Sequence, residues 1–431
     1  MDGPDHRRAL LACGALTALL LLALGLLRGE AFWSTSDGVY ALSARELLHG
    51  LDLYSGVAAA QPPPVYLAGA ALLGVDDSLT MLRAGLELAA LATALLVWLA
   101  VWRLTQRPWL AVAAGVATPL LPVMLHENAL LTPETIGAPL LLGVAVLAAR
   151  PGGAAWAGAL AAVAASTKLS FALPALAVLL VSPVRRRAIA WFAGTGVLLA
   201  AAGTLIWGGD LWRSIITAQA QSGNTALRNL GGLLAQEGWN LIGLVVLAGL
   251  GLRARVLDAE LRRTVVAAAA GSLVLGLTVV KLGTYVNVVQ VAEPPLLVLG
   301  AVGLASVTAR ARVVAFACVA LLVAQSGSLL IHPSDPRPYT RPFAESGPRR
   351  LLSDGQVERF ARAPRACPAG APYPGIPYLA FVAHRRAPGD QPDVFILNSE
   401  SNGSFRARYQ AELPAACPPG APTVDPNGNA G

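Results

Sequence analysis

Charge-free apolar runs recur along most of the chain and are separated by short charged loops. Each run is about 14 to 22 residues long, close to the length that an α-helix needs to cross ~30 Å of hydrocarbon. The eleven runs cover residues 9–27, 88–102, 109–125, 135–149, 154–167, 169–184, 188–209, 238–252, 264–280, 294–309 and 313–331. The alternating pattern of a membrane β-barrel is absent from the sequence. The pattern therefore predicts an all-α polytopic membrane protein with about eleven transmembrane helices.

Composition supports a membrane protein over a soluble one. Of the 431 residues, 55% are hydrophobic and only 13% are charged, and the mean hydropathy is +0.58. The formal net charge of +7 does not indicate nucleic-acid binding, because the basic residues lie in short loops beside apolar runs, where they meet anionic membrane lipids. The first run follows a basic start and resembles a signal peptide, but its length and its poor cleavage site favour an uncleaved anchor.

The basic residues predict how the chain is oriented in a cell (plasma or inner) membrane. With the N-terminus in the cytoplasm, about two thirds of the lysines and arginines before residue 332 lie in cytoplasmic loops, as the positive-inside rule requires. Most acidic residues then fall on the opposite face, although acids do not set topology. An odd number of spans places residues 332–431 outside the cytoplasm. We therefore expect the polar chemistry on the outer face.

Two segments depart from the alternation of apolar spans and short loops. One lies within the predicted transmembrane domain, residues 1–331, and the other follows that domain. The first outer loop, residues 28–78, carries an amphipathic pattern over 39–48 that predicts a helix on the membrane surface. A triple proline at 62–64 then precedes a short apolar stretch, 65–75, which is suited to an interfacial helix. The second segment is the extracytoplasmic C-terminal region, residues 332–431.

The C-terminal region differs in composition from the rest of the chain. It is rich in proline and has strand-like pieces at 378–383 and 393–397, so we expect either a small α/β appendage or partial disorder, with the last dozen residues disordered. Cys367 and Cys417 both lie here, and an oxidising compartment predicts a disulfide between them. Cys13 and Cys318 fall within spans and are expected to be packing residues.

The first outer loop contains the strongest candidate for chemistry. Asp37 follows the first span, where a carboxylate can accept a proton from a hydroxyl acceptor. It heads a spaced pattern made of Asp37, Tyr40, Ala44, Leu47, Leu48, Gly50 and Tyr54. The alternative is that Asp37 only caps the helix that begins there.

This pattern resembles the first loop of C-type (GT-C) integral membrane glycosyltransferases, which include protein mannosyltransferases, lipid A aminoarabinose transferases and arabinosyltransferases. The resemblance implies a GT-C-like fold with interfacial helices in the first outer loop. It also implies a hexosyl- or pentosyltransferase that moves a sugar from a polyprenyl-phosphate donor to a hydroxyl on a glycan, lipid or protein acceptor. Asp37 would be catalytic and Tyr40 would contact the substrate.

A second acidic cluster follows the third span. Glu134 matches the acid that the family carries near the head of the fourth span, and Glu127 is the rival candidate for the same catalytic role. Glu134 could instead only interact with the dipole of its helix. His126 beside Glu127 makes a divalent metal ion possible, although the spacing is not diagnostic; no other cofactor is expected.

Both lysines of the chain, Lys168 and Lys281, fall at predicted outer ends of spans. An ammonium there could neutralise a lipid phosphate as the sugar bond breaks, whereas the alternative is that each only reaches the membrane surface. Residues 167–170 resemble the family's T-K-x-[ST] turn, and residues 281–287 resemble its K-x-G-[ST]-x-x-N segment, which adds Asn287 as a substrate-binding candidate.

Three other functions stay open at this stage. A transporter or flippase should carry polar residues near the middle of the membrane. A polymerase or ligase of lipid-linked polysaccharide would use arginines in a late outer loop, which makes Arg213 and Arg228 candidate binding residues. A noncatalytic assembly partner would tolerate neutralisation of the acids. The sequence leaves the sugar, the acceptor, the lipid length, metal dependence and the oligomeric state undetermined.

Overall fold

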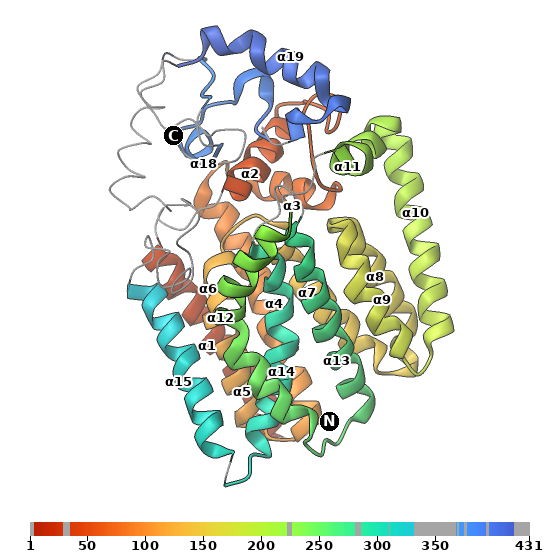
Figure 1. Ribbon diagram of the computed structural model, residues 1–431, viewed down its shortest axis with the longest axis vertical. Coiled ribbons are helices and arrows are strands. Elements are labelled where there is room, and N and C mark those ends of the chain that lie inside the picture. The colour runs from red at the N-terminus through yellow and green to blue at the C-terminus, as the bar shows by residue number, and fades with distance from the viewer. Residues whose placement is uncertain are drawn as a thin grey trace.

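The structure is a computed structural model that describes residues 4–28, 35–221, 226–280, 286–309, 311–331, 368, 370–374, 377–393 and 396–417. Within these residues the regular structure is helical, apart from one isolated bridge between Leu53 and Val57. The prediction of an all-α polytopic protein is thus confirmed. Two groups of helices are visible in Figure 1: a bundle of roughly parallel helices below, and a layer of shorter helices above it, which we call the cap.

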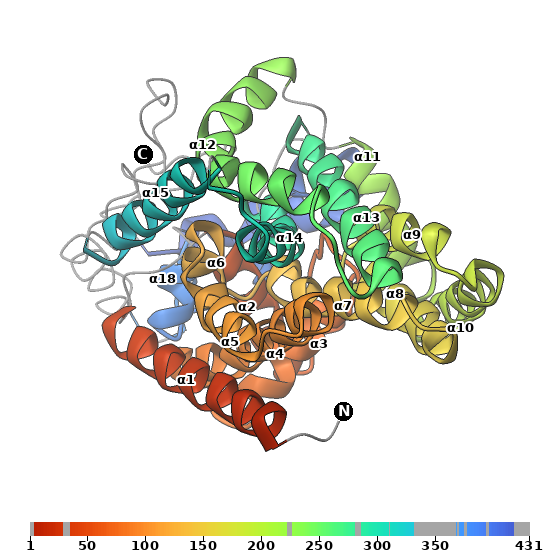
Figure 2. The same ribbon diagram turned by 90° about the horizontal axis from the view of Figure 1, so that it is seen from below.

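The bundle contains the helices that the apolar runs predicted. It consists of α1 (Pro4–Arg28), α4 (Leu79–Thr105), α5 (Pro108–Ala117), α6 (Pro122–Glu127), α7 (Pro133–Ala148), α8 (Ala154–Thr167), α9 (Ala172–Val181), α10 (Arg185–Trp212), α12 (Ala226–Leu252), α13 (Ala259–Leu275), α14 (Glu293–Ala305) and α15 (Arg312–Ile331). Five described segments are long and apolar enough to cross a membrane: Asp5–Leu26, Leu79–Thr105, Arg185–Gln221, Ala259–Thr278 and Asn287–Ala305. The other bundle helices are shorter or, like α12 and α15, have only a shorter apolar part, Gly238–Leu252 and Arg312–Gly327. Figure 2 shows the bundle from its lower end.

Several predicted spans are helices that break near one end. The run 109–125 consists of α5, the 3-10 turn Thr118–Leu120 and α6, because Pro119 and Pro122 lack the amide hydrogen that a continuous helix needs. Likewise the 3-10 segment Leu169–Phe171 separates α8 from α9, and the 3-10 helix η6 (Val286–Ala292) precedes α14. These breaks lie where the bundle meets the cap, and they bring polar residues into it.

The cap consists of α2 (Thr35–Leu48), α3 (Pro64–Leu73), the short α11 (Gln219–Gln221), α18 (Pro377–Val382) and α19 (Gly403–Glu412). Its helix α2 differs from the prediction of a surface helix. Residues 37–46 are all buried, including Arg45 and Glu46, because α3 and α18 both pack against the helix. The prediction of a short helix near 65–75 is confirmed by α3.

The described residues of the strand-like pieces in the C-terminal region are not in strands. Residues 377–382 form α18, and Ile396–Asn398 is a 3-10 turn. In the described part of the chain there is no sheet edge for these segments to pair with, so they pack as helices. Cys417 is in a disulfide, and its predicted partner, Cys367, lies outside the described residues, as do the last fourteen residues of the chain. Cys13 and Cys318 are free.

Polar contacts attach the described C-terminal segments to the first loop. The Gln391 side chain accepts a hydrogen bond from the amide of Ala58 at 2.7 Å and donates one to the carbonyl of Gly56 at 2.8 Å. Arg408 donates to the same Gly56 carbonyl at 3.0 Å. These segments are therefore a packed part of the cap.

Helix α4 fixes the distance between the two ends of the bundle. Its 27 residues span about 40 Å at 1.5 Å per residue. Arg83 lies near the end beside the cap and Arg103 near the other, so these two buried arginines are about 30 Å apart, the thickness of a hydrocarbon core.

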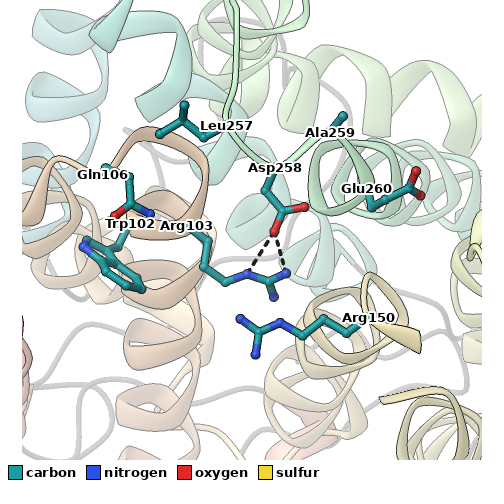
Figure 3. A pocket seen from close by; sticks show the side chains of 8 residues that line it. All are labelled: Trp102, Arg103, Gln106, Arg150, Leu257, Asp258, Ala259 and Glu260. Carbon is teal, nitrogen blue, oxygen red and sulfur yellow. Dashed lines mark hydrogen bonds and ion pairs between the residues drawn. The ribbon is translucent and has the colours of Figure 1, made fainter. Parts of the chain in front are cut away.

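Figure 3 shows a pocket at the end remote from the cap, lined by Trp102, Arg103, Gln106, Arg150, Leu257, Asp258, Ala259 and Glu260. The Arg103 guanidinium donates to Asp258 Oδ2 at 2.6 and 3.1 Å and to the carbonyl of Val146 at 3.2 Å. Asp258 also caps α13, because its Oδ1 accepts from the amide of Leu261 at 2.9 Å. The carboxylate thus joins α4 to α13 and neutralises a buried cation.

We predict that Asp258→Ala lowers the free energy of unfolding by about 2 to 3 kcal/mol, because it leaves Arg103 buried without its counter-charge and removes a helix cap. The measurement is the unfolding midpoint of purified protein in detergent. Glu260→Gln in the same pocket is the matched control, because Glu260 pairs only with the exposed Arg263 among the described groups, and exposed pairs contribute little. Equal effects of the two substitutions would contradict the prediction.

Candidate active site

Asp37 lies in the first turn of α2 and is buried between the cap and the bundle. Its Oδ1 accepts a hydrogen bond of 2.7 Å from the amide of Leu131, in the turn between α6 and α7. The carboxylate therefore bonds to an element 94 residues away in sequence. A role limited to capping α2 does not account for this contact.

Burial raises the pKa of Asp37 to about 6, because the carboxylate loses its hydration. The Leu131 amide and the positive charge of Arg83 act in the opposite direction. Smaller effects come from Glu127, which raises the pKa, and from His126, which lowers it. Near neutral pH the group is therefore a carboxylate with a proton affinity well above that of an ordinary aspartate, as a general base requires.

His126 and Glu127 form a buried pair at the end of α6, with 2.8 Å between His126 Nδ1 and Glu127 Oε1. The Thr135 hydroxyl donates to the Glu127 carbonyl at 2.9 Å and holds this turn against α7. No group of three or more side chains suited to a metal ion occurs among the described residues. A metal ion at His126 and Glu127 would need further ligands from a substrate, and it stays a prediction.

Glu134, Lys168 and Asn287 meet in a second buried cluster, although they come from three separate elements. Glu134 is 0% exposed; its Oε1 accepts from Lys168 Nζ at 2.5 Å and its Oε2 accepts from Asn287 Nδ2 at 2.9 Å. Lys168 is placed there by the break after α8, where its backbone is extended. The resemblance named these three residues separately, and the fold brings them together. Lys281 lies outside the described residues.

A polar edge on η6 (Val286–Ala292) and the first residue of α14 connects this cluster to α6. Asn287, Gln290 and Glu293 are three residues apart, and a 3-10 helix has three residues per turn, so they share one edge. Asn287 bonds to Glu134, and Gln290 Nε2 donates to Asn128 Oδ1 at 3.3 Å.

Glu293 completes this edge by holding the start of α6. Its carboxylate accepts from the amides of Val123 at 3.1 Å and Met124 at 2.7 Å, two groups that would lack partners at a helix N-terminus. The contact fixes α6 and therefore the position of His126 and Glu127 at its other end. Sequence reasoning did not single out Gln290 or Asn128, although the repeated spacing of three was a usable signal.

Three other candidates have different surroundings. Tyr40 is buried in the cap and its ring centroid is 5.5 Å from that of Tyr66. Arg213 is exposed and pairs with Asp210 at 2.8 Å, and no interaction described here connects it to Asp37 or Glu134. Arg228 lies on α12, and its side chain is outside the described part of the structure.

Arg83 is the residue that sequence reasoning missed. It is 7% exposed in α4, and its charge acts on Asp37. Its place in the sequence was not a usable signal, because Arg83 precedes the apolar run 88–102, and only the fold extends that helix back to Leu79.

No family model and no curated protein matches the sequence. Among solved structures, the chain is similar to ArnT from Cupriavidus metallidurans bound to undecaprenyl phosphate, with a TM-score of 0.61, 13% identity, and coverage of 94% of this chain and 89% of that one. Apo ArnT from the same organism gives a TM-score of 0.56 and 15% identity, with 93% and 72% covered. At this identity the likeness concerns the fold. The chain therefore has an ArnT-like fold, in agreement with the architecture that the resemblance of its first loop implied.

Proposed function

We propose that the protein transfers a sugar from a polyprenyl-phosphate donor to a hydroxyl acceptor at the membrane surface that the cap covers. One observation carries the proposal: a buried aspartate of raised pKa lies between cap and bundle in a chain with this fold. The solved neighbour is bound to undecaprenyl phosphate, which supports the same class of lipid carrier here. The inner membrane and the outward orientation of this surface are part of the proposal.

The transfer is a displacement at the anomeric carbon of the donor. The acceptor hydroxyl gives its proton to the Asp37 carboxylate as its oxygen forms the new bond to that carbon. The bond from the carbon to the phosphate oxygen breaks, and polyprenyl phosphate leaves with the electron pair. Attack opposite the leaving group inverts the configuration.

Lys168 is suited to neutralise the leaving phosphate. An ammonium has three donor hydrogens, and Glu134 takes one of them. The Lys168 side chain is 16% exposed whereas that of Glu134 is fully buried. A phosphate can therefore reach the remaining N–H donors of Lys168 but not the Glu134 carboxylate. Glu134 then holds the lysine in place, and Lys281 is proposed as a second cation for the same phosphate.

The arrangement of charge favours an enzyme over a transporter. Arg83 and Arg103 lie near the two ends of α4, and the clusters of Asp37 and Glu134 lie beside the cap, whereas a transporter places its binding groups near the middle of the membrane. The polymerase or ligase alternative depends on Arg213 and Arg228. The exposed pairing of Arg213 with Asp210 does not favour it.

We predict that Asp37→Asn reduces sugar transfer by about 10²- to 10⁴-fold, the usual contribution of a general base. Folding should be retained, because ionising a carboxyl with a raised pKa costs stability that the amide does not. The measurement is loss of labelled polyprenyl-phosphate sugars from a panel, incubated with purified protein in lipid. Asp52→Asn, an exposed acid of the same loop, is the control. Retained turnover in Asp37→Asn would exclude this residue as the base.

We predict that transfer increases with pH through an apparent pKa of about 6, because only the ionised Asp37 can accept a proton. The sign follows from the raised pKa: below this value the carboxyl is protonated and inactive. The measurement is kcat/KM for donor turnover between pH 5 and 8. A profile that is flat over this range, or that declines with pH, contradicts the assignment.

We predict that Lys168→Met lowers stability by about 3 kcal/mol, because Glu134 is then a buried charge without its cation. Combining it with Glu134→Gln should restore most of the unfolding midpoint. Transfer should stay low in the double variant, because the phosphate still lacks its cation. If the double variant regains both stability and transfer, Lys168 has only a structural role.

A further inference from the structure

The helix α18 of the C-terminal region lies directly on α2, beside Asp37. At Gly38, the residue after Asp37, an added Cβ would lie 2.1 Å from the backbone nitrogen of Tyr378 and 2.7 Å from the carbonyl carbon of Pro377. Backbone therefore meets backbone at this point, and only glycine allows the approach. Figure 1 shows the two helices side by side in the cap.

The other end of α18 is also fixed to α2. Arg45 of α2 donates to the carbonyl of Phe381 at 2.9 Å, and its guanidinium lies 4.0 Å from the centroid of the Phe381 ring. Two attachments, at Gly38 and at Arg45, set both the position and the rotation of α18. The side chain of Tyr378 is consequently held in one place.

The Tyr378 hydroxyl connects α18 to α4. Arg83 Nη2 lies 3.4 Å from this oxygen and donates to it, and both side chains are buried. The Arg83 charge also acts on Asp37. A tyrosine of the C-terminal region, an arginine of α4 and the aspartate of α2 thus form one buried group, although 341 residues separate the first of them from the last in sequence.

We propose that Arg83 and Tyr378 are a positioning pair for Asp37, so that the C-terminal region is a required part of the active centre. The inference rests on the proposed function of Asp37. Tyr378 holds the guanidinium by one of its donors, and the guanidinium favours the ionised form of Asp37. Tyr378 thereby acts on the base without touching the substrate.

The direction of the effect follows from the charges that face Asp37. Among the described groups these are Arg83 from α4 and His126 and Glu127 from α6, while α18 contributes the neutral Tyr378. When the hydroxyl is removed, Arg83 loses an acceptor and is less firmly held near the carboxyl. The ionised form of Asp37 then loses stabilisation, and more of the group is protonated at a given pH.

The test compares Tyr378→Phe with Tyr373→Phe. Both tyrosines are buried in the same hydrophobic cluster of the cap, but the Tyr373 hydroxyl makes no hydrogen bond within the described part. In Tyr378→Phe we expect the acid side of the pH profile of donor turnover to shift to higher pH by about half to one unit. The rate of turnover should therefore decrease by roughly 3- to 10-fold below pH 6 and be unchanged near pH 8. Tyr373→Phe should keep the parent profile. A loss that is equal at every pH, or an unshifted limb, overturns the proposal.

A double-mutant cycle tests whether the effect passes through Arg83. Tyr378→Phe should shift the limb much less in an Arg83→Lys background, because lysine lacks the planar fork that the hydroxyl orients. Additive shifts of the two substitutions would overturn a shared action.

An unfolding experiment keeps the inference separate from the proposed function. A folded protein with a buried carboxyl of raised pKa loses stability as the pH rises. The loss begins near pH 4, about the pKa of the carboxyl in the unfolded chain, and continues through its pKa in the folded protein. This decline of the unfolding midpoint should extend to higher pH in Tyr378→Phe and disappear in an Asp37→Asn background. If no donor is turned over, the proposed function fails while this shift still supports the pair. If the midpoint curves of parent and Tyr378→Phe coincide, the pair fails whatever the activity.

Discussion

Charge cannot be left unpaired in a hydrocarbon layer, and the arrangement of this protein follows from that constraint. Helix α4 illustrates it, because its two buried arginines are about one hydrocarbon thickness apart and each has partners from other elements. Arg103 forms an ion pair with Asp258 at one end of the helix, and Arg83 donates a hydrogen bond to the Tyr378 hydroxyl at the other. The charged groups that we propose for chemistry, Asp37, Glu134 and Lys168, lie at the end of the bundle where the cap can cover and pair them.

The cap and the bundle depend on each other at this end. The Leu131 amide bonds to Asp37 of the cap, and Arg83 of the bundle bonds to Tyr378 of the cap. Within the bundle, Glu293 holds the start of α6 and so positions the turn that bonds to Asp37. A carboxylate with a pKa of about 6 results from this joint burial, and neither part would produce it alone.

Two details differ from the predictions for one physical reason: the exposure of the helix in the first loop, which is present, and the strands of the C-terminal region. Residues 39–48 carry an amphipathic pattern, which predicted a helix at the membrane surface, yet α2 is buried because α18 returns from the far end of the sequence to cover it. The strand-like composition of 378–383 was also misleading, because the surface available to that segment is a helix with a glycine at Gly38. Local patterns do not reveal which distant segment will supply the other half of an interface.

The sequence by itself determined the membrane class, the helical fold and the positions of the apolar helices, and it singled out Asp37, Glu134 and Lys168 as candidates. These follow from length, periodicity and local motif, which depend only on neighbouring residues. The tertiary structure decided the pairing of Glu134 with Lys168 and Asn287, and the place of Arg83 beside Asp37. Such pairings depend on which helix ends the packing brings together, because a buried charge takes its partner from whatever element lies next to it in space.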